Sequence, residues 1–456
     1  MSRVIKMYFH DYQSVSNEEE VSLLQCVQQN IREGKARITV LGDGMEVSEK
    51  ESVPLIGKYI GRDYYTQQYV GVLFDHQTGV RITFGSRFDK NDGNKSFLSY
   101  MLKKVFGSKA FIFESMQVSA SRDKAFEQML LFIFVYLLEK AMKKGTFKQY
   151  MNFDFYDSNI KGTINFNVYM KQIMMQDGRL PYRVRERSAM NPVNIGILTA
   201  YDVLKSKNPT FVQQVFKKNP LLSRFIAQIK GELPNYRSID KKQLLKQLAK
   251  SIRHPYFTEV ESLRKVCIEI IRHSGSDIFQ EENQMITGLL IDVNKLWEYF
   301  LEHTIFAEMK KMSAPYEVST QDSYPVLYEL KDFDMKIKPD FVLSRNKQNQ
   351  AVFDAKHRPA WSNKKTSAVK KDVYQISMYM SALNVSIGGV IYPTTKNGDV
   401  VASSPISEKW MGGQFYLIPY NIPESDDLEV LLDNQNEELA NEIINILAKV
   451  KEDPSA

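Results

Sequence analysis

Short apolar runs separated by polar stretches dominate the first 110 residues. The runs are rich in β-branched and aromatic residues, which is typical of strands. The polar stretch at residues 89–95 predicts a loop between two of them. We therefore expect a strand-rich N-terminal domain over residues 1–110, with strands at residues 36–41, 69–74, 80–84 and 110–113.

Longer helical patterns follow over residues 111–280. Residues 123–144 predict a long helix that stops at Gly145, and its apolar run at residues 129–138 is too short to cross a bilayer and predicts a buried helix. Residues 191–272 are also expected to be helical, because prolines divide the stretch into segments of helix length. These prolines are Pro209, Pro220, Pro234 and Pro255.

A β-ribbon is predicted between these helical segments, at about residues 152–187. Its halves, residues 152–169 and 180–187, flank a turn where Asp177-Gly178 is a strong hairpin signal. So long a ribbon has little core to bury its tip, so we expect it to project and bind a partner. Arginines there suit bidentate contacts with carboxylates or phosphate. A hairpin packed on its own domain is the alternative, and the expected partner-binding residues are Met174, Met175, Arg179 and Arg183.

The pattern changes again over residues 281–422, which predict a C-terminal α/β domain. The expected order is a helix, a strand hairpin with a polar turn at residues 344–350, a second helix and a buried strand. These elements are predicted at residues 289–306, 341–343, 351–353, 372–383 and 388–393.

Residues 423–456 form an acidic segment with ten carboxylates against two lysines. An apolar stripe nevertheless recurs along it at helical spacing, so we expect a docked helix rather than a free tail. The stripe consists of Leu439, Ile443, Ile446 and Val450. The whole chain is thus predicted to be an α+β multidomain protein with a strand-rich N-terminal region, a helical middle and an α/β C-terminal core.

Composition narrows the class of protein only slightly. The net charge of +6 fits a nucleic-acid partner without establishing one. Cys26 and Cys267 have no paired spacing, so neither a zinc site nor a disulfide framework is predicted. Residues 1–11 lack the apolar core of a signal peptide, and we expect a cytoplasmic protein with no membrane association.

The candidate chemistry lies in the predicted hairpin. Asp340 immediately precedes one strand, while Asp354 and Lys356 close the other and share a face because side chains alternate along a strand. We expect this cluster at a solvent-accessible strand end. Clustered carboxylates suit Mg²⁺, and a lysine can orient a water or stabilise charge on a phosphate. The cluster therefore predicts metal-dependent phosphodiester cleavage, with Mn²⁺ as a substitute ion.

Flanking helices supply further candidates. Glu298 lies in the first helix as a possible metal ligand, and Gln375 and Tyr379 are four residues apart on the second. A helix with Glu, a strand with Asp, a strand with Asp-x-Lys and a helix with Gln resembles the PD-(D/E)xK nuclease core. Each piece alone is also typical of a solvated surface. Basic residues expected to contact DNA phosphates are Lys364, Lys365, Lys370 and Lys371, for which a solvated face is the alternative.

The middle of the chain resembles the McrC family, the nuclease subunits of McrBC-type modification-dependent (type IV) restriction systems. The resemblance rests on residues 159–166 (Asn-Ile-Lys-Gly-Thr-Ile-Asn-Phe) and residues 191–198 (Asn-Pro-Val-Asn-Ile-Gly-Ile-Leu), together with the C-terminal motifs. Thr163 stands where the family commonly has arginine, and Gly196 stands at a commonly basic position. The resemblance covers roughly residues 110–422.

This resemblance implies a division of labour between two proteins. A McrB-like AAA+ GTPase hexamer would recognise modified cytosine in double-stranded DNA, while the McrC-like subunit would cleave and would stimulate GTP hydrolysis through a projecting finger. No Gly-x-x-x-x-Gly-Lys-Ser/Thr motif occurs here, which agrees with a subunit that has no nucleotide site of its own. Two other functions stay open: an inactive nuclease-fold adaptor that activates a motor, and a stand-alone structure-specific nuclease.

Overall fold

The structure is a computed structural model of the chain. No helix among the residues it describes is long and apolar enough to cross a membrane. The described residues are 5–42, 47–49, 53–58, 63–75, 80–89, 96–118, 122–172, 178–233, 236–252, 254, 256–272, 286–312, 315–325, 336–357, 366–395, 406–410, 413–423, 425 and 427–449.

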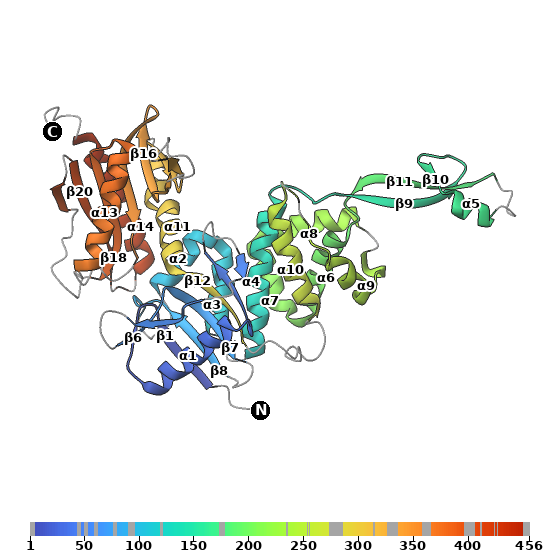
Figure 1. The fold of residues 1–456 in the computed structure, drawn as a ribbon, viewed down its shortest axis with the longest axis horizontal. Helices are drawn as coiled ribbons and strands as arrows, with labels where there is room; N and C mark the ends of the chain where they lie inside the picture. Colours follow the sequence, from blue (N-terminus) through green and yellow to red (C-terminus); the bar gives the residue numbers. More distant parts are fainter. Residues whose placement is uncertain are drawn as a thin grey trace. The chain divides into compact units, whose positions relative to one another are not determined.

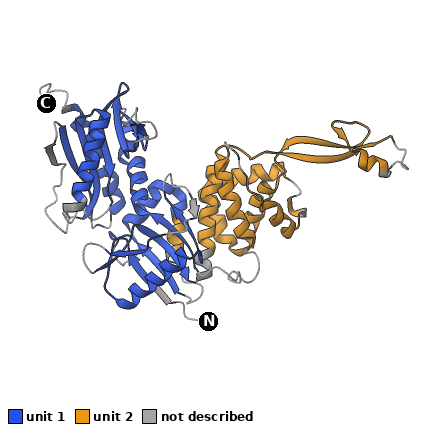
Figure 2. Ribbon diagram, viewed as in Figure 1, with its two compact units in different colours: residues 1–110, 282–456 blue, residues 111–281 orange. Residues whose placement is uncertain are grey.

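The chain forms two compact units, shown in different colours in Figure 2. One combines residues 1–110 with residues 282–456, and the other consists of residues 111–281. The first unit is therefore built from both ends of the sequence, with the second inserted between them.

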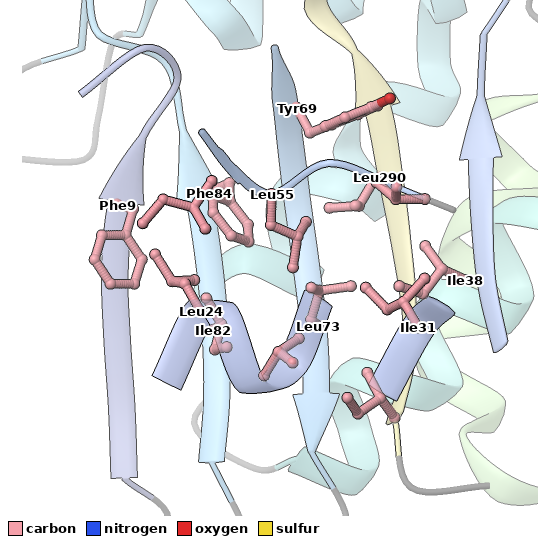
Figure 3. Close-up of a cluster of buried hydrophobic side chains, with 14 of the residues drawn as sticks. Phe9, Leu24, Ile31, Ile38, Leu55, Tyr69, Leu73, Ile82, Phe84 and Leu290 are labelled. Atoms are coloured by element: carbon pink, nitrogen blue, oxygen red, sulfur yellow. The ribbon is translucent and has the colours of Figure 1, made fainter. Parts of the chain in front are cut away.

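A six-stranded sheet organises the N-terminal part of the first unit, in the order β1-β8-β7-β12-β3-β4. Helix α1 packs on the sheet, and Leu24 and Ile31 from this helix meet Leu73 and Ile82 from the strands in a buried cluster (Figure 3). Asn17 caps α1 by accepting a hydrogen bond from the Glu19 N–H at 2.9 Å. The elements of this part are β1 (Ile5–His10), β2 (Ser14–Val15), α1 (Glu18–Arg32), β3 (Ala36–Leu41), β4 (Val47–Glu49), β5 (Ile56–Lys58), β6 (Tyr64–Thr66), β7 (Tyr69–Asp75), β8 (Val80–Gly85), α2 (Phe97–Phe106) and η2 (Gly107–Lys109).

The strands predicted at residues 36–41, 69–74 and 80–84 are confirmed as β3, β7 and β8. The strand predicted at residues 110–113 is wrong, because those residues begin helix α3 (Ala110–Val118). Phe113, within the predicted run, and Met116, just beyond it, are both fully buried. A short apolar run does not by itself distinguish a buried strand from a buried helix. Of the predicted loop, residues 90–95 lie outside the described residues.

The predicted helix at residues 289–306 is wrong at its beginning. Residues 286–292 form strand β12 (Ile286–Asp292), which lies between β7 and β3 in the N-terminal sheet. The helix α11 (Val293–His303) begins only after Asp292, whose side chain accepts a hydrogen bond from the Asn294 N–H at 3.0 Å. The C-terminal region thus completes the N-terminal sheet before its own fold begins.

A second six-stranded sheet organises the C-terminal part, in the order β13-β16-β17-β18-β20-β19. The first three strands are antiparallel neighbours, and β17, β18 and β20 are parallel to one another. Its elements are α12 (Ile305–Lys311), β13 (Glu317–Thr320), β14 (Tyr324–Pro325), β15 (Lys336–Ile337), β16 (Phe341–Arg345), β17 (Gln348–Ala355), α13 (Thr366–Leu383), β18 (Ile387–Thr395), β19 (Ile406–Trp410), β20 (Gly413–Ile422) and α14 (Leu428–Lys449).

Helix α13 lies very close to strand β18. A Cβ at Gly388 would stand 2.4 Å from the Met380 sulfur and 2.9 Å from Ile376, so glycine permits this approach. The acidic C-terminal segment is confirmed as a docked helix, because Leu439, Ile443 and Ile446 of α14 are buried. Val450 lies outside the described residues.

The middle unit is a cluster of helices, as predicted, with an extended ribbon (Figure 1). Asn191 caps α6 by accepting from the Val193 and Asn194 N–H groups, both at 3.1 Å, and Pro192 follows it. Both asparagine side chains also donate to the Phe147 carbonyl, at 3.0 and 2.8 Å. The helices are α4 (Arg122–Met142), α6 (Pro192–Lys207), α7 (Pro209–Lys218), α8 (Pro220–Glu232), η3 (Tyr236–Ser238), α9 (Lys241–Leu248) and α10 (Thr258–Arg272).

The predicted ribbon is present, but its first half is shorter than expected. β9 (Gln149–Asp157) pairs with β11 (Leu180–Ser188), and the short β10 (Thr163–Ile164) adds to the other edge of β11. Residues 166–169, predicted as strand, belong to helix α5 (Phe166–Gln172). At Gly162 a Cβ would stand 2.2 Å from the Arg183 carbonyl oxygen, so the motif glycine allows this part of the chain to approach β11.

Candidate functional site

The predicted hairpin brings the two carboxylates together. Strands β16 and β17 turn at Asn346 and Lys347, whose positive φ angles of 51° and 62° match a two-residue hairpin turn. Phe341 pairs with Phe353, so Asp340 and Asp354 fall opposite one another at the next position. The Ala355 N–H donates to Asp340 Oδ2 at 2.8 Å. The backbone of one strand therefore holds the carboxylate of the other.

Lys356 completes the cluster at the end of β17. Its ammonium is in direct contact with Asp354 and lies 3.8 Å from Asp372 Oδ1. The Lys356 N–H donates to the Ile391 carbonyl at 3.0 Å, which fixes the backbone to β18. Asp354 and Lys356 thus lie on one face, as the alternation predicted.

The cluster is more enclosed than the sequence predicted. The side chain of Asp354 is 2% exposed and that of Lys356 is 14% exposed, so the expected solvent-accessible strand end is wrong. Helices α11 and α13 both pack against β17 and cover its end.

Burial shapes the protonation of the cluster. It raises the pKa of Asp340 well above the usual range, and the neighbouring charges of Asp354 and Glu298 raise it further. For Lys356, burial alone would lower the pKa, but the carboxylates of Asp354, Asp372 and Asp340 raise it overall. The ammonium is therefore held in its charged form.

Helix α13 positions the polar side chain that contacts Lys356. The Lys356 ammonium donates to Gln375 Oε1 at 3.2 Å, and Gln375 Nε2 donates to the Tyr379 hydroxyl at 2.7 Å. Asp372 lies one helical turn before Gln375 and is fully buried. Gln375 therefore lies in the cluster, as predicted.

Glu298 is buried on α11 and lies close enough to Asp340 to influence its pKa. Its carboxylate is already engaged by Lys295, at 2.9 Å to both oxygens, and by Gln321 Nε2 at 2.6 Å. In this arrangement Glu298 accepts hydrogen bonds from the protein beside the Asp340–Asp354 pair.

The donor atoms fit a hard cation with a largely aqueous shell. The charge of Asp354 raises the pKa of Asp340, so the two carboxylates lie close enough for one cation to relieve their repulsion. Among the described residues, no group of three or more His, Cys, Asp and Glu side chains is arranged as a complete ligand set. Mg²⁺ commonly keeps several waters and uses one or two carboxylates, so these two aspartates fit it.

The other predicted site residues are exposed or lie outside the described residues. Lys370 and Lys371 are exposed on α13, whereas Lys364 and Lys365 lie outside the described residues. In the ribbon, Met174 and Met175 also lie outside, and Arg179 is exposed. Arg183 is exposed but forms a two-point ion pair with Asp154, at 2.7 and 3.0 Å.

Several residues of the site were not predicted. Lys295 could have been found from its position three residues before Glu298, which places both on one helix face. Gln321 carries no comparable signal, because it reaches Glu298 from a separate segment of the chain.

A buried ion pair from the N-terminal sheet supports the residue after Lys356. Arg87 Nη1 lies 2.6 Å from Asp11 Oδ2, and Arg87 Nη2 donates to the His357 carbonyl. The Asp11 side chain is fully buried. Burial, together with the nearby charge of Arg87, lowers the pKa of His357 well below its usual value and keeps the ring neutral. The strand end that carries Lys356 is thus fixed by residues 270 or more positions earlier in the sequence.

Arg87→Met is expected to destabilise the first unit, because it leaves Asp11 buried without a counter-ion. Breaking one partner of a buried ion pair costs about 3–5 kcal/mol, which corresponds to a fall in Tm on the order of 10 °C. The Tm of each variant is measured by thermal unfolding. The matched control is Lys103→Met, which removes an ion pair with Glu429 whose side chains are 58% and 57% exposed. A Tm for Arg87→Met equal to that of the control would contradict this role.

A family model described as "McrBC 5-methylcytosine restriction system component" matches residues 65–393. No curated protein matches the chain.

Two similar solved structures come from Thermococcus gammatolerans. One is a refined half-complex of McrB AAA+ hexamers with bound McrC, at 15% identity and a TM-score of 0.49, covering 97% of this chain and 100% of that chain. The other is a McrBC complex, at 14% identity and a TM-score of 0.33, covering 67% of this chain and 88% of that chain. The family assignment rests on the family model alone, which matches well over half of the sequence. The chain belongs to the McrBC family.

Proposed function

We propose that this protein is the DNA endonuclease subunit of an McrBC-like restriction system. The observation that carries the proposal is the cluster of Asp340, the buried Asp354 and the partly buried Lys356 at a strand end, in a chain of this family. Cleavage of modified DNA in the presence of an McrB-like AAA+ GTPase and GTP tests it.

The arrangement around the cluster supports a PD-(D/E)xK nuclease core. Glu298 on α11, Asp340 before β16, Asp354 and Lys356 on β17, and Gln375 on α13 occur in the order of that core. They converge because β17 lies inside a sheet covered by both helices. Bringing five polar side chains from four elements together away from water costs folding free energy. Such clusters are typical of functional sites.

In the proposed mechanism, Asp340 and Asp354 would hold Mg²⁺, and Glu298 would support them from α11. The bound ion would supply a more acidic water and stabilise charge on the leaving oxygen. Lys356 keeps its charge beside these carboxylates and would orient the attacking water or contact a phosphate oxygen. Gln375 fixes the ammonium, and Tyr379 in turn fixes Gln375.

Metal specificity is the first expectation from this donor set. Mg²⁺ and Mn²⁺ should support cleavage, while Ca²⁺ should bind and support little turnover, since it prefers a larger and looser coordination shell. Rates measured with each ion after chelation and re-addition check this. Full activity in excess EDTA would be incompatible with a metal-dependent site.

We also propose that the β-ribbon engages a hexameric AAA+ GTPase partner and stimulates its hydrolysis. Helix α5 of the ribbon exposes Phe166 and Met170, each 66% exposed, four residues apart on one helix face. Large apolar side chains exposed together on a projecting element are typical of an interaction site. We therefore add Phe166 and Met170 to the proposed partner-binding residues, which already include Met174, Met175 and Arg179.

Activity with and without the partner separates this function from its alternatives. A restriction subunit cleaves only when the GTPase and GTP are present. A stand-alone nuclease would cleave branched or damaged DNA by itself, and an adaptor would stimulate GTP hydrolysis without any cleavage.

A further inference from the structure

A wide groove lies at the base of the β-ribbon in the middle unit. Its volume is about 1390 Å³. Strands β9 and β11 contribute one set of lining residues, and the end of α9 with the segment after it contributes another. All of its lining residues belong to residues 111–281, so the groove is built within one unit and contains none of the site residues described above.

The groove is lined by cations and by no acid. Seven lysines and arginines line it, and no Asp or Glu is among its described lining residues. Three of the cations are neutralised by carboxylates from outside the lining, namely Lys144 by Glu259 at 2.8 Å, Lys148 by Glu232 at 3.3 Å and Arg264 by Glu261 at 2.5 Å.

The other four cations, Arg185, Arg187, Lys246 and Lys250, have no acidic partner within the described part of the chain. Arg185 and Arg187 are two positions apart on β11, so their side chains leave the same face of the ribbon. Lys246 and Lys250 lie on and just beyond α9. Uncompensated positive charge therefore comes from two different elements around one groove.

Two exposed tyrosines lie among these cations. Tyr150 is 62% exposed and pairs with Arg187 across the ribbon, and the Arg185 guanidinium lies 5.2 Å from its ring centre. Tyr256 is 58% exposed on the other set of lining residues. Tyrosine hydroxyls, like arginine and lysine, donate hydrogen bonds to phosphate oxygens.

We propose that this groove binds the phosphodiester backbone of nucleic acid, as a second site separate from the cleavage cluster. Protein–protein interfaces are depleted in lysine and in charged residues at their centre, whereas nucleic-acid interfaces are much more positively charged. Phosphate contacts carry no sequence information, so the groove would hold DNA without selecting a site. The proposal goes beyond the proposed cleavage activity, because it requires binding alone.

The test is the affinity of the full chain for labelled single-stranded and double-stranded DNA, measured over a range of salt concentrations. The variant replaces Arg185, Arg187, Lys246 and Lys250 with glutamine. Each lost phosphate contact reduces the salt slope by about 0.9 for a duplex and about 0.7 for a single strand. Loss of four contacts should therefore lower the slope by up to about 3.6 units for a duplex or about 2.8 units for a single strand, and the affinity at least tenfold. The form of DNA that loses affinity identifies the form that the groove holds.

A matched control makes the same change in net charge outside the groove. It replaces Lys205, Lys217, Arg224 and Lys242 with glutamine, which are exposed on α6 to α9 of the same unit. Equal Tm values for the two variants show that neither effect comes from unfolding.

Two results would overturn the proposal. One is a groove variant with the affinity and salt slope of the control variant for both forms of DNA. The other is a groove variant that binds DNA like the control but no longer stimulates the AAA+ partner, which would make the groove a protein-docking site. Cleavage is not measured, so failure of this proposal is distinct from failure of the proposed nuclease.

Discussion

Replacing Lys356 with alanine is expected to lower the rate of DNA cleavage by about 10²–10³-fold, the usual effect of removing one preorganised stabilising group. The ammonium is 14% exposed, contacts Asp354 directly and is held by Gln375 at 3.2 Å. A group placed this firmly needs little reorganisation during the reaction, and its charge is maintained by the surrounding carboxylates. The measurement is a single-turnover rate with Mg²⁺, the GTPase partner and GTP.

Stimulation of the partner's GTP hydrolysis is the internal control for Lys356→Ala, because the ribbon belongs to the other unit. Lys310→Ala, on the exposed face of α12, removes the same charge from the same unit away from the site. Cleavage by Lys356→Ala at the rate of Lys310→Ala would show that the active site lies elsewhere.

Replacing both Phe166 and Met170 with serine should weaken binding to the GTPase partner strongly and abolish stimulation at moderate concentrations. Apolar anchors at the centre of an interface commonly contribute about 2 kcal/mol or more each, so their joint loss would reduce affinity by two to three orders of magnitude. Both side chains are 66% exposed, so serine removes no core packing from the unbound protein. GTP turnover is measured as a function of subunit concentration.

Leu221→Ser serves as the control for this pair, because Leu221 is 50% exposed on α8 rather than on the ribbon. If the Phe166→Ser, Met170→Ser variant stimulates GTP hydrolysis at the same subunit concentration as the wild-type protein, α5 does not contact the partner. Cleavage should fall together with stimulation if the GTPase drives the reaction.

Local patterns predicted the elements whose hydrophobic period and turn signals agree. The hairpin of β16 and β17 was predictable because two apolar runs flank a polar turn, and the alternation of side chains placed Asp354 and Lys356 on one face. The helix that carries Gln375 and Tyr379 was predictable from its period. Asp340 could be placed beside Asp354 because the chain connects the two strands directly.

Other elements depended on contacts far away in the sequence. Strand β12 pairs with β7 and β3, more than two hundred residues earlier, and its apolar run alone does not distinguish a strand from the beginning of α11. Asp292, the residue that caps α11, was the local signal for the boundary. Helix α5 interrupts a stretch predicted as strand. Its large apolar residues are exposed rather than aligned toward a core, so the sequence carries no amphipathic pattern that would predict a helix there.

Long-range contacts also explain what could not be predicted about the site. Arg87 reaches the His357 carbonyl across 270 positions, and Gln321 reaches Glu298 from outside its helix. Enclosure of the cluster by α11 and α13 depends on the packing of whole elements, so the strand end looked accessible from sequence alone. Residue types and spacing therefore predicted which side chains come together better than they predicted what surrounds those side chains.

The most direct test of the proposed active site is single-turnover DNA cleavage by Asp354→Asn with the McrB-like GTPase, GTP and Mg²⁺. The substitution keeps the shape of a side chain that is 2% exposed while removing the charge that would hold the ion. We expect this variant to stimulate GTP hydrolysis as the wild-type protein does and to leave the DNA uncleaved. Cleavage by Asp354→Asn at the wild-type rate would contradict this expectation.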